Sequence, residues 1–330
     1  MKIKAFFLFI ILNLLFSCHK EKLHPINFYY WKTTVDIGKI EEEYFNSLHC
    51  NKLYVRFFDV DKYENQFPIP KAVIKDFTQL NLKAEYVPVI FITNRSLQNL
   101  SQNNISELAK KINSLISYIY KTNHFQEYTE IQLDCDWTSS TRDNYFYLLS
   151  ELKSISHKNI SCTIRLHQVK FREKTGIPPV DKGYLMCYAT SNPTEESNKN
   201  SILDIDLLKD YLSTIRTYPL EFDIALPLFS WGIVKNHMGK IKIINGLTTE
   251  ELENKKFTKI SENRYKVMED HFLHGLYLNK DFIITIENIS PKLLNETKMY
   301  LSKKIDKPYS IIYFHLDSIF VKRFKTEELL

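Results

Sequence analysis

The sequence predicts a parallel α/β fold, a (β/α)8 TIM-like barrel with an insertion after the seventh strand. Eight strand-like runs alternate with segments of helical periodicity, which is typical of parallel sheets. The chain has 330 residues, more than the roughly 250 of a typical TIM barrel, and one long segment interrupts the alternation. The alternative, a doubly wound open sheet, is disfavoured because no glycine-rich dinucleotide turn follows the first strand.

The predicted strands are short apolar runs rich in β-branched and aromatic residues. They cover 27–34, 52–60, 84–92, 130–137, 160–168, 183–189, 221–229 and 310–316. The segment 232–281 follows the seventh strand and contains further strand-like runs at 240–244 and 277–278, with another at 282–287. We interpret 232–281 as the insertion.

The helices between the strands are predicted from apolar stripes that repeat every three or four residues. The stripe is clearest in 105–121 and 142–156, and further helices are predicted over 70–79, 204–214 and 290–304. Asp204 and Ser290 are suitable N-cap residues, and Pro291 would then occupy a first helical position, where proline is favoured.

The first eighteen residues have the pattern of a bacterial export signal. Lys2 and Lys4 precede the apolar run 5–16, which is shorter than the about 20 residues of a membrane span. The run ends before Ser17 and Cys18, which resembles the lipobox of bacterial lipoproteins. The resemblance implies a signal peptide over 1–17 and a lipidated Cys18; the alternative is an ordinary cleaved signal followed by a chance cysteine.

This reading divides the chain and places it in the cell. Residues 18–25 would be the lipidated cysteine and a short tether, and 26–324 a single barrel domain that includes the insertion. Acyl chains would anchor the protein to the cell envelope, with the outer membrane expected and the exposed face left open.

Composition excludes several classes of partner. The net charge is +5 and falls by two when Lys2 and Lys4 are removed, so nucleic acid is not expected as a partner. No nucleotide motif and no C-x-x-C metal spacing occur, so no cofactor or metal is expected. Four of the five cysteines follow Cys18, and we expect them to be free and buried, although an exported protein could pair them.

Polar residues inside the predicted strands indicate the candidate site. In 130–137 the apolar residues alternate with Gln132, Asp134 and Asp136, which should therefore point into the barrel. Buried carboxylates need partners, and Arg56, Arg165 and His167 can supply them from neighbouring strands. We interpret Asp134 as the more structural carboxylate, Asp136 as the more catalytic one, and His315 as a core residue.

Two short motifs resemble glycoside hydrolase family 18, whose fourth strand ends in D-x-x-D-x-D-x-E and whose sixth carries Met-x-Tyr-Asp. Asp134 and Asp136 match the second and third aspartates, and Met186 to Tyr188 match Met-x-Tyr. Ile131, Thr138 and Ala189 stand in place of the first aspartate, the catalytic glutamate and the last aspartate, so the family mechanism does not carry over directly. The arrangement of parts also resembles uncharacterised TIM-barrel lipoproteins of Bacteroidetes-type bacteria, through Tyr29-Tyr30-Trp31, 132–137 and Phe229-Ser230-Trp231.

Three functions follow from these residues. The favoured hypothesis is a tethered glycan hydrolase with Asp136 and Asp134 as catalytic residues; a non-catalytic glycan- or peptide-binding lipoprotein and a structural envelope protein are the alternatives. A hydrolase needs a second carboxylate across the cleft, for which Asp59, Asp61, Asp317 and Glu287 are the candidates. The expected ligand is a polysaccharide or a peptidoglycan-type glycan, and the residues predicted to contact it are Tyr30, Trp31, Asp59, Trp137, Arg165, His167, Tyr188, Trp231 and Asp317.

Overall fold

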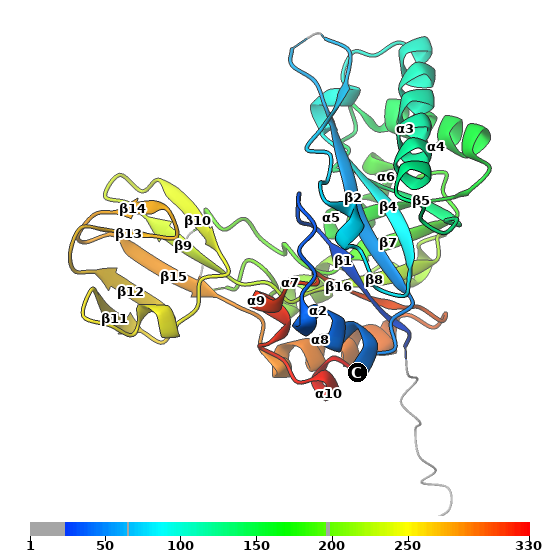
Figure 1. The fold of residues 1–330 in the computed structure, drawn as a ribbon. Helices are drawn as coiled ribbons and strands as arrows, with labels where there is room; N and C mark the ends of the chain where they lie inside the picture. Colours follow the sequence, from blue (N-terminus) through cyan, green and yellow to red (C-terminus); the bar gives the residue numbers. More distant parts are fainter. Residues whose placement is uncertain (1–23, 65, 196–198) are drawn as a thin grey trace, which may run out of the picture.

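The structure is a computed structural model that describes residues 24–64, 66–195 and 199–330 (Figure 1). The signal sequence and Cys18 lie outside the described residues, so their prediction is not tested. Within the described residues, no helix is both long and apolar enough to cross a membrane.

Eight parallel strands close into the predicted barrel. Each strand pairs with its neighbour in chain order, and the first also pairs with the last, which closes the ring. The strands are β1 (Ile26–Tyr30), β2 (Lys52–Asp61), β4 (Glu85–Ile92), β5 (Glu130–Asp134), β6 (Asn159–Arg165), β7 (Lys182–Met186), β8 (Phe222–Pro227) and β16 (Ile311–Phe314). The short β3 (Ile69–Lys71) pairs antiparallel with the end of β2.

Helices cover the outside of the barrel, and two of them, α7 and α8, begin at predicted caps. The Ser290 side chain accepts a hydrogen bond from Leu293 N, and Pro291 follows it at the start of α8. Asp204 caps α7 in the same way. The helices are α2 (Lys39–Ser47), α3 (Gln102–Thr122), α4 (Arg142–Ser156), α5 (Leu166–Lys170), α6 (Arg172–Thr175), α7 (Ile205–Tyr211), α8 (Pro291–Lys304), α9 (Ser318–Val321) and α10 (Thr326–Leu329). Short 3-10 turns are η1 (Phe77–Gln79), η2 (Asn94–Leu97), η3 (Ile215–Thr217) and η4 (Glu250–Leu252).

One predicted helix is wrong. Residues 70–79 form the end of β3, a loop and the turn η1 instead of a helix. Ala72 and Asp76 have positive φ angles of 48° and 58°, which the right-handed helix cannot include. Pro70 follows Pro68, and a residue that precedes proline is biased towards extended conformations. The apolar spacing there reflects side chains that pack singly against the barrel.

The insertion lies between β8 and β16, as predicted, and projects from one side of the barrel (Figure 1). It is a five-stranded antiparallel sheet in the order β10-β9-β15-β12-β11 with a separate hairpin, β13–β14. One face of the sheet packs into its own core through Val234, Tyr265 and Ile284. The strands are β9 (Trp231–Lys235), β10 (Ile241–Asn245), β11 (Phe257–Ser261), β12 (Arg264–Val267), β13 (His271–Leu273), β14 (Leu276–Leu278) and β15 (Ile283–Glu287). The sheet therefore extends beyond the predicted end at residue 281.

The barrel interior combines aromatic and polar side chains. Gln132 and Asp134 of β5 point inward, while Ile131 and Leu133 join the outer core beneath the helices. The Tyr29 hydroxyl donates to Gln132 Oε1 at 2.7 Å across the interior. The predicted alternation of faces in this strand is thus confirmed, and it brings the next inward position, Asp136, to the barrel mouth, where the C-terminal ends of the strands meet.

Candidate functional site

Asp134 lies inside the barrel, below the mouth. Its residue is 5% exposed, and Thr163 Oγ1 of β6 donates to its carboxylate at 2.6 Å. Burial raises the pKa of the Asp134 carboxyl; Arg165 opposes this effect, and Asp136 adds to it. Asp134 can therefore hold a proton at a pH where an exposed aspartate has lost its own.

Asp136 lies at the surface of the mouth and pairs with Arg165. The guanidinium donates through Nε to one carboxylate oxygen and through Nη2 to the other, the latter at 3.3 Å. The Asp136 side chain is 53% exposed, whereas that of Arg165 is 24% exposed. Burial disfavours the charge of Arg165, but Asp134 and Asp136 outweigh it and raise the pKa of the guanidinium. Arg165 therefore stays positively charged, pairs directly with Asp136 and acts on Asp134 through its charge.

The four candidates for a second catalytic carboxylate all lie near the mouth, and each already has a hydrogen-bond or ion-pair partner within the chain. Asp59 accepts two hydrogen bonds from Arg56, one of 2.7 Å. Arg56 was expected to pair with Asp134, but it pairs with Asp59 instead. Asp61 accepts from Arg95 and Thr93, and the Arg95 guanidinium holds the pKa of its carboxyl well below the usual range.

The two remaining candidates have structural roles. Glu287 accepts from the backbone and hydroxyl of Ser201, at 3.1 and 2.5 Å, and from Trp231 Nε1 at 2.9 Å. Asp317 caps α9 through Ile319 N and lies 3.3 Å from Lys32 Nζ. Neither carboxylate is placed as an unpaired acid above Asp136.

Position 138 carries an exposed threonine where the resemblance would require the catalytic glutamate. The Thr138 hydroxyl lies 2.9 Å from Ser140 Oγ and 3.5 Å from the Asn94 amide. A hydroxyl has no acidity near neutral pH, so this position cannot protonate a leaving group.

Five aromatic side chains form a continuous surface across the mouth, which we call the aromatic floor: Trp31, Tyr188, Phe229, Trp231 and Phe314. Ring centroids are 5.4 Å apart for Trp31 and Phe314, 6.0 Å for Phe314 and Phe229, and 5.3 Å for Phe229 and Trp231. The guanidinium of Arg56 lies over the Trp31 ring, 5.5 Å from its centroid. Four of the five rings are only partly buried, so the floor offers apolar faces of the kind on which sugar rings stack.

Sequence reasoning found three members of the floor and missed two. Phe229 and Phe314 were assigned to strands, and neither was singled out as a contact residue. Each lies at or just beyond the C-terminal end of a barrel strand, β8 or β16. An aromatic residue at that position is the signal that would have found them, because these strand ends converge on the mouth.

Two predicted contact residues lie in the outer core instead. Tyr30 and Trp137 are fully buried. The Tyr30 hydroxyl accepts from Asp36 N at 2.7 Å, and Trp137 Nε1 donates to the Thr175 carbonyl at 2.8 Å while its ring stacks on Tyr145. Their strand positions alternate with those of the inward residues, so both side chains point away from the mouth.

The two histidines of the mouth differ in exposure. His167 lies at the start of α5, exposed overall but with part of its ring covered; this partial burial lowers the pKa of the ring, while Asp136 opposes the effect. Burial lowers the pKa of His315 to about 4, so its ring is neutral at neutral pH. The His315 Nδ1 atom has no hydrogen-bond partner among the described residues.

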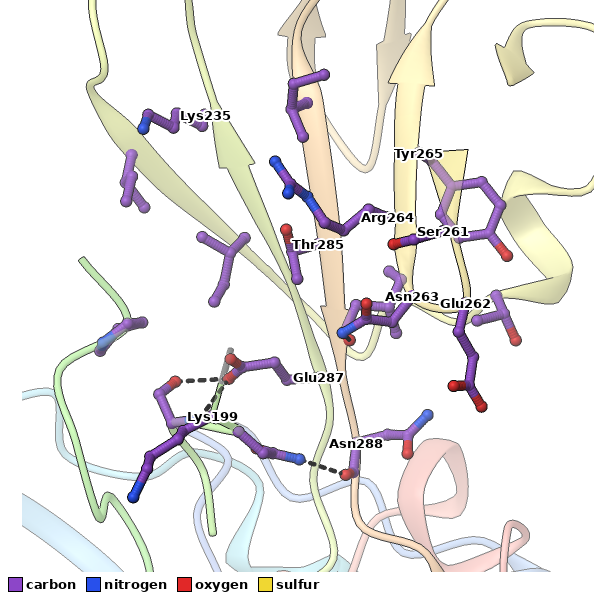
Figure 2. Close-up of a pocket in the computed structure, with 18 of the residues that line it drawn as sticks. Lys199, Lys235, Ser261, Glu262, Asn263, Arg264, Tyr265, Thr285, Glu287 and Asn288 are labelled. Carbon is purple, nitrogen blue, oxygen red and sulfur yellow. Dashed lines mark hydrogen bonds between the residues drawn. The ribbon is translucent and has the colours of Figure 1, made fainter. Parts of the chain in front are cut away.

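A separate groove lies beside the mouth, between the segment that follows β7 and the open face of the insertion sheet (Figure 2). Its cavity volume is about 1190 Å³. Described residues of its lining include Asn192, Ser201, Ile233, Arg264 and Thr285. Glu287 belongs to the groove and Trp231 to the floor, so their hydrogen bond joins the two regions. The groove was not predicted, because it depends on chain segments far apart in sequence.

The remaining chemistry of the described chain is limited. Cys50, Cys135, Cys162 and Cys187 are buried free thiols, as predicted. Residues 24–64, 66–195 and 199–330 contain no group of three His, Cys, Asp or Glu side chains that could hold a metal ion.

Comparison with known proteins finds solved structures of similar architecture. No protein-family model and no curated protein matches the sequence. Among solved structures, the Bacillus cereus spore cortex-lytic enzyme SleL is similar, with a TM-score of 0.55, 14% identity and coverage of 92% of this chain and 74% of that chain. A chitinase from Chromobacterium violaceum has a TM-score of 0.55, 10% identity and coverage of 90% and 96%.

The GH18 chitinase ChiB from the chitin utilization locus of Flavobacterium johnsoniae has a TM-score of 0.51, 12% identity and coverage of 94% and 93%. At such identities the likeness concerns the fold and leaves substrate and catalysis open. The chain therefore has a TIM barrel of the glycoside hydrolase family 18 type, which it resembles distantly and in architecture.

Proposed function

We propose that this chain is a lipid-anchored protein of the cell envelope that binds a glycan across the barrel mouth without hydrolysing it. The observation that carries the proposal is the state of the mouth carboxylates. Among the described residues, Asp59, Asp61, Asp136, Asp317 and Glu287 are all ion-paired or hydrogen-bonded, and Thr138 replaces the acid. Glycoside hydrolysis requires a carboxylic acid that can protonate the leaving oxygen.

Binding is supported by the aromatic floor. Trp31 and Phe314 present partly buried rings at the mouth, and aromatic rings supply large contact areas at low entropic cost. Arg56, which lies over the Trp31 ring, and Arg165, which pairs with Asp136 at the mouth, carry guanidinium groups that can donate to sugar hydroxyls. The likeness to chitinases and to a cortex-lytic enzyme in fold makes a hexose polymer the natural ligand class to test.

A microarray of soluble oligosaccharides, probed with the chain from residue 19 onward, tests binding. Trp31→Ala should weaken the affinity for any glycan found by about 2 kcal/mol, or roughly thirtyfold, the loss typical of a central aromatic contact. Tyr118→Ala is the matched control, because Tyr118 is an exposed aromatic on α3, away from the mouth. Equal losses in both variants, or none in Trp31→Ala, would contradict the proposal.

The anchor requires a separate experiment, since Cys18 is not among the described residues. Cells that express the full chain should hold it in the membrane fraction and label it with a radioactive fatty acid. Cys18→Ser should remove the label and release the protein from membranes. Membrane retention of the unlabelled variant would argue against lipid anchoring.

Hydrolysis remains the second candidate function, for one specific reason. Asp134 is a buried carboxyl whose pKa burial raises, and it neighbours Asp136, which is half exposed. Two neighbouring carboxyl groups in different environments, one buried and one exposed, are the arrangement that acid–base catalysis uses. This candidate predicts cleaved product, and Asp136→Asn should abolish it.

A further inference from the structure

One face of the insertion sheet lines the groove beside the mouth, and the strand register determines which side chains lie on that face. Antiparallel pairing places Arg264 of β12 opposite Thr285 of β15, and Thr285 opposite Ile233 of β9. The next row towards the far end of the groove contains Ile283 and Lys235 in the same way. These side chains share the face of the sheet that is opposite to its own apolar core. The face of the sheet that lines the groove therefore carries aliphatic side chains between polar ones.

The groove continues from the aromatic floor. Trp231 and Glu287 are register partners at the barrel end of the sheet, and Trp231 Nε1 donates to Glu287 Oε2 at 2.9 Å. The Trp231 ring also contacts Phe229 of the aromatic floor, at 5.3 Å between centroids. An extended ligand that stacks at the mouth would thus pass over Trp231 and enter the groove.

The charged side chains of the groove differ in whether they have hydrogen-bond or ion-pair partners. Glu287 is 7% exposed, and its Oε2 atom accepts hydrogen bonds from both Ser201 and Trp231. On the same face, Lys266 pairs with Asp281 at 2.7 Å. Arg264 is exposed and makes no ion pair or side-chain hydrogen bond with any other described residue. It is therefore a cation available to a ligand.

The direction of the Arg264 side chain places this cation over the groove. Figure 2 shows it extending across β15 beside Thr285, while the carboxylate of Glu262 points away on the other side of β12. Glu195 and Glu253 also line the groove, and neither forms an ion pair with Arg264. A guanidinium presents a planar set of donors that matches a carboxylate with two parallel hydrogen bonds.

We propose that the groove selects a carboxylate-bearing oligosaccharide, of the uronic-acid type, whose carboxylate is bound by Arg264. The inference rests on the proposed glycan binding at the mouth and names the class of glycan. Stacking on the aromatic floor would hold the neutral faces of the sugar rings, and Arg264 would distinguish an acidic oligomer from a neutral one. A charge-assisted pair at an accessible site is sensitive to salt, so the preference should weaken as ionic strength rises.

Isothermal titration of the chain from residue 19 onward with tetragalacturonate and with cellotetraose tests this inference. Wild type should bind the acidic oligomer at least tenfold more tightly in low salt. Arg264→Ala should remove that preference, while Arg264→Lys should keep part of it, since lysine retains the charge without the planar donors. Lys242→Ala is the control, because Lys242 is an exposed cation on the opposite face of the same sheet and should leave the preference unchanged.

The outcomes separate this inference from the proposed function. Equal affinities for the two oligomers, absence of tetragalacturonate binding, or an unchanged preference in Arg264→Ala would overturn the role of Arg264. Binding that depends on Arg264 but not on Trp31 would support the groove and reject binding at the mouth. Binding that depends on Trp31 but not on Arg264 would reject the groove and support the mouth.

Discussion

The barrel mouth and the insertion groove lie side by side and differ in how their charges are used. At the mouth, Asp136 is paired with Arg165, Asp59 with Arg56, and the remaining surface is aromatic. In the groove, a cavity of about 1190 Å³ is lined mainly by polar side chains and contains Arg264, which forms no ion pair with any other residue that the structure describes. The two regions therefore offer different contacts: the mouth presents aromatic rings beside paired charges, and the groove presents polar side chains beside an exposed guanidinium.

The largest expected effect is a loss of stability, and it distinguishes Trp137, which follows β5, from Trp31, which follows β1. Trp137 is fully buried against Tyr145, so Trp137→Ala should lower the free energy of unfolding by about 3–5 kcal/mol. Trp31 is only partly buried, and its replacement should cost affinity far more than stability. Urea unfolding followed by titration of the folded protein measures both quantities.

The expectation is contradicted if Trp31→Ala loses mainly stability and Trp137→Ala loses mainly glycan affinity. Trp137→Phe serves as the control, since it retains an apolar ring and should fold even if the alanine variant does not. A Trp137→Phe protein that folds normally but loses glycan binding would place Trp137 at the binding surface.

A pH-dependent effect of intermediate size distinguishes Asp134. Burial raises its pKa in the folded chain above the usual value of about 3.9, so the folded state binds more protons than the unfolded state between these two values. The contribution of Asp134 to stability is therefore full below the usual pKa and decreases as pH rises through the folded one. Asp134→Asn should remove this decrease while keeping an acceptor for Thr163.

Urea unfolding of wild type and Asp134→Asn at several pH values between acid and neutral measures the effect. The stability of the variant relative to wild type should increase with pH. A relative stability that declines as pH rises would show that Asp134 is held ionised by Arg165.

The smallest expected effect belongs to Asp136. Its side chain is half exposed, so its ion pair with Arg165 is solvated, and Asp136→Asn should change the free energy of unfolding by less than about 1 kcal/mol. Thermal or urea unfolding gives the value. A loss several times larger would contradict this expectation and make the ion pair a structural element of the mouth.

The sequence predicted the barrel well because its signals are local. The period-two pattern of 130–137 identified the inward faces of Gln132 and Asp134, and Ser290 marked the start of α8. The helix predicted over 70–79 was wrong because positive φ angles at Ala72 and Asp76 override the apolar spacing. Strands β11 and β12 were missed because their exposed faces are polar and weaken the apolar signal.

The candidate site was less predictable, because it depends on contacts between distant segments. Arg165 was predicted from its strand position as a partner for the inward carboxylates, chiefly Asp134, and in the structure it pairs with Asp136. The hydrogen bond between Ser201 and Glu287 could not be predicted from the sequence, since the two residues lie 86 positions apart. The groove is likewise set by the register of β9, β15 and β12, which no single run of residues encodes.

The fate of a bound oligosaccharide tests the central claim most directly. A glycan that binds the chain from residue 19 onward should be incubated with wild type and with Asp136→Asn, and its mass followed by mass spectrometry. Wild type should return the oligosaccharide intact, and Trp31→Ala should bind it more weakly. Shorter products that form with wild type and disappear with Asp136→Asn would contradict binding without cleavage and establish hydrolysis.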